Sequence, residues 1–316
     1  MCIIWVQEKL NRLISRLNFF IANRKQGIFS IMKYTKPYLL ISLSSFLIFS
    51  NFQSSDNSKW KSLFNGKDVS GWDTYIGPAY NKATDKFDGV PAGLNNDTNH
   101  VFTVVKEDGK KSIRISGEYF GGISTKEEFE NYHLRLEFKW GTLKWAPRKD
   151  SKRDSGILYH AVGKHGADGG FWMRSQEFQI QEGDCGDYWG VAGGTFDVHA
   201  TPRNEKQFVY DPAGKLLTFS AKSPTGRQCI KNPDGEKTTG QWNTVDIYCF
   251  GGTSIHMING VVNMILYNSR QQDGEQESPL TKGKIQIQSE GAEIFYTNIQ
   301  VELIDKLPEN LMNDLK

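Results

Sequence analysis

The chain consists largely of short segments rich in β-branched and aromatic residues, and turn signals separate these segments from one another. Such segments predict β-strands, and no long segment beyond the N-terminal region has the 3.6-residue period of a helix. The pair Asn259-Gly260 predicts a two-residue hairpin, because both central residues of that turn must adopt φ > 0. Asp108-Gly109 and Asp273-Gly274 are further turn signals. The expected strands cover residues 101–108, 111–117, 132–140, 155–162, 177–182, 194–200, 216–221, 242–250, 254–260, 261–268, 284–291 and 293–304.

About a dozen strands in a chain of 316 residues favour two packed antiparallel sheets. We therefore predict an all-β fold, a two-sheet antiparallel β-sandwich of concanavalin-like or jelly-roll type. Leu134, Leu136 and Phe138 share one predicted face of their strand, and charged side chains share the other. Segments 177–182 and 284–290 alternate in the same way. One face of each strand is thus expected in the core, and the other carries a row of polar side chains.

The N-terminal region contains an uncharged apolar run of 12 residues, 39–50, which follows Lys33 and Lys36 and precedes a polar stretch. This run is too short to span a bilayer and predicts a signal peptide that begins at Met32. We favour an upstream start-site extension before it over a functional amphipathic helix, and expect periplasmic or secreted location without stable membrane insertion after cleavage. The expected organisation is 1–31 extension, 32–53 signal peptide, 54–59 linker, 60–305 β-sandwich domain and 306–316 C-terminal tail.

Charge and motif content exclude several classes of function. With 38 basic and 36 acidic residues the net charge is +2, so nothing predicts a nucleic-acid partner. No HExxH, GxSxG or P-loop motif occurs, and no CxxC supports a cysteine-based zinc site. Cys185, Cys229 and Cys249 are expected as buried free thiols, although an oxidising compartment would permit a Cys185–Cys229 bridge.

Glu177, Gln179 and Gln181 form the polar row with the clearest chemical potential. Period-two spacing places them on one sheet face about 7 Å apart, where they could bind a sugar and seat a general acid or base. A plain solvated face is the alternative. The Gly-rich loop that follows adds Glu182 and Asp184, which are candidate oxygen ligands for a hard cation or ordinary turn residues.

Other candidates flank this row. His160 has the side chain best suited to act as a base near neutral pH, and Asp154 lies at the start of the same strand. Gln288 and Glu290 would join the polar surface if their strand neighbours that of Glu177. The remaining candidates are tryptophans, which either cover the apolar face of a sugar or fill the core: Trp140, Trp145, Trp172 and Trp189.

Taken together and in order, seven segments resemble the 3-keto-disaccharide hydrolase family of secreted bacterial proteins. They are LFNGKDVSGW (63–72), YHLRLEFKWG (132–141), RDSGILYH (153–160), SQEFQIQEGDCGDYWG (175–190), QWNTVDIYCFGG (241–252), INGVVN (258–263) and GKIQIQSEGAEIFYTNIQVELI (283–304). The resemblance covers about residues 60–304 and implies a concanavalin-like sandwich that cleaves glycosides already oxidised at C3. A 3-keto group acidifies the C2–H bond, so a base can start β-elimination of the C1 aglycone, and water can then add.

The resemblance also implies roles for individual residues. Glu177 and Gln179 match the family's Glu-x-Gln motif, whereas Gln181 stands where many members carry Asp, which argues against a metal ligand there. Either His160 or Glu177 is the expected base, and Lys139 or a divalent metal is expected to stabilise the enolate. Gln179 is expected to orient the sugar. The cofactor therefore stays open, and the expected partner is an oxidised glycoside.

Two other functions remain open from the sequence. Glu177 and Glu182 resemble the ends of the Glu-x-Asp-x-x-Glu signature of laminarinase-type glycoside hydrolases, but Gln179 replaces the central Asp. Retaining hydrolysis needs two carboxyl groups about 5–5.5 Å apart, so a bulge would have to bring these two to one face. A non-catalytic carbohydrate-binding module is the other alternative, because fold alone does not determine function.

Overall fold

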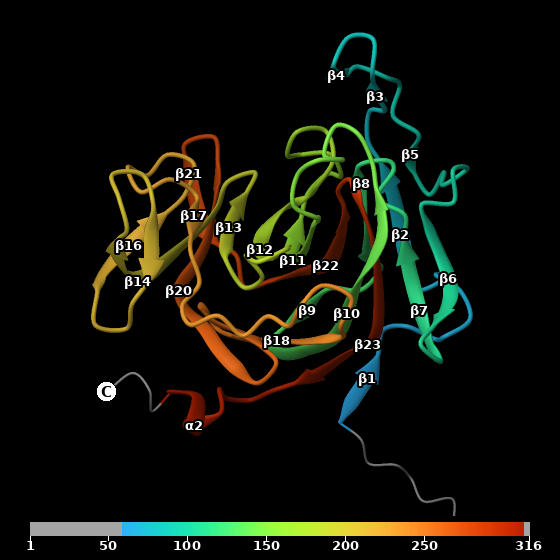
Figure 1. Cartoon of the computed structure of the whole chain (residues 1–316). Coiled ribbons are helices and arrows are strands. Elements are labelled where there is room, and N and C mark those ends of the chain that lie inside the picture. Colours follow the sequence, from blue (N-terminus) through green and yellow to red (C-terminus); the bar gives the residue numbers. More distant parts are fainter. Residues whose placement is uncertain (1–58, 313–316) are drawn as a thin grey trace, which may run out of the picture. The chain divides into compact units, whose positions relative to one another are not determined.

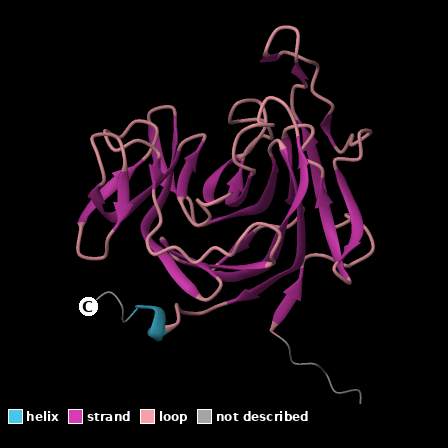
Figure 2. Cartoon of the chain, viewed as in Figure 1, coloured by secondary structure: helices cyan, strands magenta, loops and turns pink. Residues whose placement is uncertain are grey.

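The computed structural model describes residues 59–312, and these residues form strands and loops with one short helix, α2 (Glu309–Met312), as Figure 2 shows. Each of the twelve predicted segments coincides with a strand, which confirms the all-β prediction. The predicted extension, the signal peptide and most of the linker lie outside the described residues. Within 59–312 no helix is long and apolar enough to cross a membrane.

The larger sheet has 12 strands joined by antiparallel pairing. Its main order is β15 (Phe208–Tyr210), β14 (Gly194–Pro202), β20 (Val261–Asp273), β19 (Thr253–Ile258), β18 (Asn243–Phe250), β10 (Tyr132–Lys144), β23 (Ala292–Leu303), β7 (Lys110–Ile115) and β6 (Phe102–Glu107). Three strands extend it: β1 (Trp60–Ser62) pairs with β23, β16 (Lys215–Phe219) with β14, and β21 (Gln276–Pro279) with β20. Asn259 and Gly260 both have positive φ between β19 and β20, which confirms the predicted hairpin.

The smaller sheet has 9 strands and carries the polar rows. Its order is β17 (Gln228–Cys229), β13 (Tyr188–Val191), β12 (Arg174–Gln181), β11 (Asp154–Val162), β22 (Lys282–Ser289), β8 (Gly121–Thr125), β2 (Trp72–Ile76) and β5 (Gly93–Leu94), with β9 (Phe129–Glu130) paired to β22. A separate hairpin joins β3 (Tyr80–Asn81) and β4 (Lys86–Phe87). In Figure 1 the strands from β14 through β10 to β7 follow an outer arc, and β13, β12, β11 and β22 lie inside it.

The core lies between the two sheets and consists of the apolar halves of the alternating strands. Leu134 and Phe138 of β10 are fully buried there, as are Phe178 and Ile180 of β12 and Ile287 of β22. Because side chains alternate along a strand, the neighbouring polar residues of β12 and β22 must point to the opposite face of the smaller sheet. The predicted division into core face and polar face is therefore confirmed for these strands.

One strand departs from simple alternation. Between Tyr159 and Val162 the register of β11 against β12 shifts, and His160 adopts a φ of 51° within this bulge. The His160 ring consequently packs edge-on against Tyr132 and Tyr159 in the interior. Simple alternation would place His160 and Tyr159 on opposite faces of the sheet, but alternation does not hold across the bulge.

The three cysteines within the described residues, Cys185, Cys229 and Cys249, are buried free thiols. Burial raises the pKa of all three thiol groups. They therefore stay protonated and act as small apolar core residues rather than as nucleophiles or metal ligands.

Candidate functional site

A pocket of about 180 Å³ opens on the polar face of the smaller sheet, over strands β11, β12 and β22. The structure brings eight of the sequence-predicted site residues to this pocket: Asp154, Trp172, Glu177, Gln179, Gln181, Trp189, Gln288 and Glu290. Arg148, Asp168, Val191 and Arg227 complete its lining. The polar row of β12 therefore belongs to a hollow with charged walls rather than to an open solvated face.

Gly156 of β11 lies between two polar side chains of the pocket, Glu177 and Gln288. The strand of Gln288 does not pair directly with that of Glu177, because β11 lies between them. A Cβ atom on Gly156 would lie 2.2 Å from Glu177 Oε1 and 2.4 Å from Gln288 Oε1. The missing side chain thus lets two polar groups from strands on either side converge over the middle strand.

Glu177 is a buried carboxyl with few partners. Its residue is 5% exposed, and burial together with the nearby Asp154 carboxyl raises its pKa well above the usual range. In the amide orientation that satisfies both groups, Gln179 donates to Glu177 Oε1 at 2.8 Å and to the Ser155 carbonyl at 3.1 Å. Glu177 is therefore held in place by Gln179 while remaining able to exchange a proton.

A second carboxyl, Asp154, lies at the start of β11. Its Oδ2 accepts hydrogen bonds from Arg148 and from the Gln181 amide. Burial raises the pKa of Asp154 to about 7, although the Arg148 guanidinium opposes the shift. Arg148 Nη1 also lies 3.5 Å from Glu290 Oε1, and burial followed by the Asp154 charge raises the pKa of Glu290 well above its usual range. Three protonatable carboxyls thus face one pocket, and one of them titrates near neutrality.

Aromatic and charged side chains form the other wall. The Arg227 guanidinium stacks over the Trp189 ring at 5.3 Å and pairs with Asp168 at 3.4 Å. Trp172 is fixed by an indole hydrogen bond of 3.0 Å to the Gly121 carbonyl. Within the described residues, Trp189 Nε1, Gln288 Oε1 and Arg148 Nε are buried without a partner. Since buried polar atoms normally have partners, these orphan atoms mark positions where a polar ligand can bind.

Four predicted site residues do not line the pocket. One of them, Trp145, donates its indole hydrogen bond to the Ser116 carbonyl at 2.9 Å. Lys139 is on β10 in the larger sheet and pairs with Glu107 and Asp108 at 2.6 and 2.7 Å. Trp140 is 3% exposed and belongs to the core, and it contacts the Phe138 ring. Burial lowers the pKa of His160 to about 3, so it is neutral at physiological pH and does not line the pocket. None of these four side chains therefore lines the pocket.

The metal candidates also lie outside the pocket. Glu182 accepts from Arg153 at 3.0 Å and from the Thr239 hydroxyl, and Asp184 pairs with Lys152 at 2.6 Å. Both carboxylates are thus already neutralised by basic side chains or hydrogen-bonded. No three His, Cys, Asp or Glu side chains of residues 59–312 are grouped so that they could hold a metal ion. Neither Glu182 nor Asp184 belongs to a group of potential metal ligands in this part of the chain.

Sequence reasoning missed Arg148, Asp168 and Arg227. Each lies in a loop between two strands, where side chains follow no regular alternation. No local sequence pattern therefore marks any of them. The only available signal for Arg148 was its position between two segments of the family resemblance.

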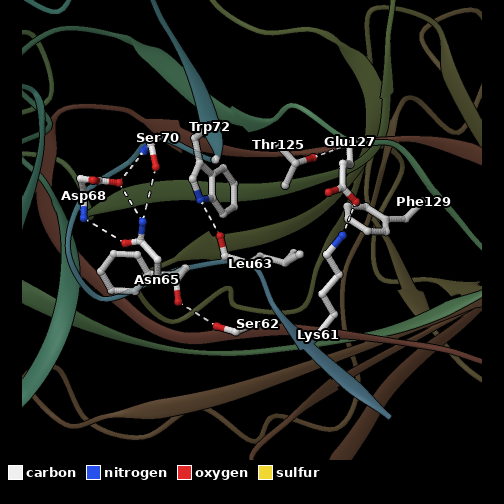
Figure 3. A pocket seen from close by; sticks show the side chains of 12 residues that line it. Lys61, Ser62, Leu63, Asn65, Asp68, Ser70, Trp72, Thr125, Glu127 and Phe129 are labelled. Atoms are coloured by element: carbon white, nitrogen blue, oxygen red, sulfur yellow. Dashed lines mark hydrogen bonds and ion pairs between the residues drawn. The ribbon is translucent and has the colours of Figure 1, made fainter. Parts of the chain in front are cut away.

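A cavity of about 390 Å³ lies apart from this pocket, where the segment LFNGKDVSGW meets β8 and β9. Figure 3 shows its polar groups paired with one another: the Trp72 indole donates to the Leu63 carbonyl at 2.8 Å, and Asn65 donates to Asp68 at 2.8 Å. None of the unpartnered buried atoms found in residues 59–312 belongs to its lining. The polar groups of this cavity are therefore used within the protein, and none of them is left to bind a ligand as the groups of the first pocket are.

Comparison with known proteins gives one match by sequence. The sequence model described as 3-keto-alpha-glucoside-1,2-lyase-like domain matches residues 59–302. No curated protein matches the chain.

Solved structures give distant likenesses. A protein of Parabacteroides distasonis, whose glycosyl hydrolase assignment is itself provisional, shares 17% identity at a TM-score of 0.42, covering 78% of this chain and 94% of that one. The carbohydrate-binding module CBM66 from Bacillus subtilis shares 7% identity at a TM-score of 0.36, covering 64% and 91%. LamAcat from Zobellia galactanivorans shares 11% at 0.36, covering 73% and 91%.

Proposed function

Since the chain belongs to the family of 3-keto-alpha-glucoside-1,2-lyase-like domains and so has a carbohydrate-processing role, we propose that it cleaves glycosides oxidised at C3 of the sugar. The observation that carries this proposal is the pair of buried carboxyls, Glu177 and Asp154, that line one pocket with raised pKa values. Elimination next to a ketone needs two proton transfers at neutral pH, and such groups are suited to both. Export of the chain, suggested by residues 32–53, remains part of the proposal.

Glu177 takes the C2 proton. The C2–H electron pair then forms a C2=C3 bond while the C3=O π pair moves onto oxygen, which gives an enolate. Gln179 holds the Glu177 carboxyl in position through its 2.8 Å hydrogen bond. A carboxyl whose pKa is raised by burial is a stronger base once it is ionised, so the buried position of Glu177 favours this step.

Asp154 serves the leaving oxygen. The enolate reforms C3=O and forms C1=C2, the C1–O bond breaks, and its electron pair stays on the aglycone oxygen, which receives a proton from Asp154. A pKa of about 7 leaves a large fraction of Asp154 protonated at neutral pH. The products are a 2-hydroxyglycal ketone and the free alcohol, and addition of water across C1=C2 gives net hydrolysis.

The geometry gives less support to the two alternatives. The register of β12 against β11 is regular from Phe178 to Gln181, so no bulge turns Glu182 toward Glu177. Glu182 instead pairs with Arg153 outside the pocket, and the laminarinase-type carboxyl pair is not assembled. A binding module would use the tryptophans but gives no reason for the two buried carboxyls, Glu177 and Asp154, which are costly to bury without a function.

The test uses the full chain with 3-keto-trehalose and 3-keto-4-nitrophenyl glucoside, beside the unoxidised compounds. Wild type is expected to cleave only the keto substrates and to exchange the C2 proton in D₂O, which NMR measures. Glu177→Gln is expected to lose both exchange and cleavage. Asp154→Asn is expected to keep exchange and to lose cleavage of 3-keto-trehalose far more than of 3-keto-4-nitrophenyl glucoside, whose leaving group needs no proton.

Each alternative has its own signature in this experiment. Cleavage of the unoxidised compounds would establish an ordinary glycosidase. Sugar binding without exchange or cleavage would establish a binding module. Full exchange by Glu177→Gln would remove Glu177 from the base role while leaving the reaction type intact.

A further inference from the structure

Formation of an enolate places negative charge on the C3 oxygen, and a pocket that catalyses this step must offer a positive group or strong donors there. Among residues 59–312 no group of His, Cys, Asp or Glu side chains could hold a metal ion, so we consider the side chains that line the pocket for this role. Two cationic side chains line the pocket, Arg148 and Arg227. Arg227 is already stacked on Trp189 and paired with Asp168, and its side chain is 40% exposed.

Arg148 is held in a defined position within the pocket. Its aliphatic stem lies against Gly291, where an added Cβ would come within 2.9 Å of Arg148 Cβ. Gly291 itself has a φ of 79°, and its carbonyl accepts a 2.8 Å hydrogen bond from the Trp145 backbone. The loop that carries Arg148 is therefore packed against the end of the smaller sheet, and these contacts hold the guanidinium in a preorganised position.

The guanidinium still has capacity for a ligand. One terminal nitrogen donates to Asp154, and Nη1 lies 3.5 Å from Glu290, which is long for a hydrogen bond. Arg148 Nε is buried and has no partner. Arginine presents five donors in a fixed fork, so several of them remain for an oxygen atom in the pocket.

The two carboxyls beside Arg148 neutralise its charge only in part. Burial raises the pKa of Glu290 well above the usual range and that of Asp154 to about 7. When these two carboxyls are protonated, the charge of Arg148 is available to an anionic oxygen in the pocket.

We propose that Arg148 binds the C3 oxygen of the substrate and stabilises the enolate, and so fills the position that a metal ion would take in this chemistry. The proposal rests on the proposed cleavage of 3-keto-glycosides. Arg148 is a catalytic residue under this proposal, because it contacts the oxygen on which charge develops, while Asp154 and Glu290 hold its guanidinium.

The experiment measures C2 proton exchange in D₂O and kcat/KM for cleavage in wild type, Arg148→Lys, Arg148→Met and Arg153→Met. Arg153 is the matched control, because it lies in the same loop, pairs with Glu182 and does not line the pocket. Arg148→Met is expected to lower both exchange and cleavage by about 10²–10³-fold, the usual loss for an oxyanion donor. Arg148→Lys should lose less, added guanidinium should restore part of the Arg148→Met activity, and Arg153→Met should stay within about threefold of wild type.

Removal of divalent metal ions by EDTA is the second part of the experiment. Wild type dialysed against EDTA is expected to keep its rates of exchange and cleavage. Loss of activity that a divalent cation restores would overturn the proposal, as would exchange by Arg148→Met within threefold of wild type. Wild type that fails to exchange the C2 proton would instead refute the proposed function itself. Thermal unfolding of each variant shows whether a loss reflects the site, and guanidinium rescue of Arg148→Met excludes a purely structural loss.

Discussion

Replacing Gly156 by alanine should damage the site while leaving the fold intact. The new Cβ would lie 2.2 Å from Glu177 Oε1 and 2.4 Å from Gln288 Oε1, and Cβ atoms essentially never approach other heavy atoms within 3.0 Å. The two oxygens must therefore move away by about 0.8 and 0.6 Å, the differences between 3.0 Å and these contacts. Both are the far ends of side chains that face the pocket, so the backbone of β11 need not shift.

The expected energies follow from these displacements. Forcing two side chains off their rotamers costs about 0.5–1.5 kcal/mol each, and the lower entropy of the unfolded chain offsets about 0.4–1 kcal/mol for Gly→Ala. The free energy of unfolding should therefore fall by no more than about 2.6 kcal/mol, a Tm change of several degrees in a domain of this size. Activity is far more sensitive, because a misplacement of about 1 Å in a catalytic group costs on the order of 10²-fold.

Gly122→Ala on β8 is the matched control. Its Cβ would come within 2.8 Å of Gln286, a glutamine on the same sheet face that lies outside the pocket. We expect both variants to show similar thermal unfolding, whereas kcat/KM on a 3-keto aryl glucoside falls about 10²-fold only in Gly156→Ala. Wild-type activity in Gly156→Ala, at equal stability, would refute the idea that convergence of Glu177 and Gln288 over β11 creates the site.

Two further outcomes follow from the same structure. Asp154 binds its proton more tightly in the folded protein, because its pKa is raised to about 7, so its contribution to stability is fully present below pH 4 and is lost as pH rises to 7. Wild type should accordingly lose stability relative to Asp154→Asn as the pH rises from 4 to 7, which urea titrations of both proteins measure. A difference in unfolding free energy that stays constant over this pH range would contradict the raised pKa. Lys139→Met should retain wild-type kcat and KM and lose less than about 1 kcal/mol of stability, because its ion pairs lie on the other sheet at the surface. A lower kcat in this variant would instead show that Lys139 takes part in the reaction.

The elements that sequence reasoning predicted well are those whose pattern is local. Period-two alternation placed Glu177, Gln179 and Gln181 on the face opposite Phe178 and Ile180, because alternation depends only on strand geometry. Short Gly-rich strands such as β8 were not predicted. An added Cβ at Gly121 would lie 2.1 Å from the Tyr75 carbonyl, so this glycine serves a close approach of two backbones that its neighbours in sequence do not reveal.

The predicted site residues that the structure places outside the pocket, and the lining residue Arg148 that was not predicted, have the same explanation. His160 lies in a bulge that turns its ring into the core, and a bulge depends on pairing with a partner strand rather than on local composition. Arg148 lies in a loop and reaches the pocket because Gly291, far along the chain, leaves room for its stem. Lys139 and Trp140 belong to β10, which is assigned to the other sheet by strand order alone.

Strand order is thus what turns a polar row into a site. The row on β12 would be a solvated sheet face if its neighbour carried an ordinary side chain at position 156, because that side chain would separate Glu177 from Gln288. The order β12, β11, β22 instead places a glycine between two polar strands, while the loop before β11 delivers a cation to their ends. Burial then raises the pKa values of the carboxyls, so the proton transfers that we propose depend on the pairing of strands that are distant in sequence.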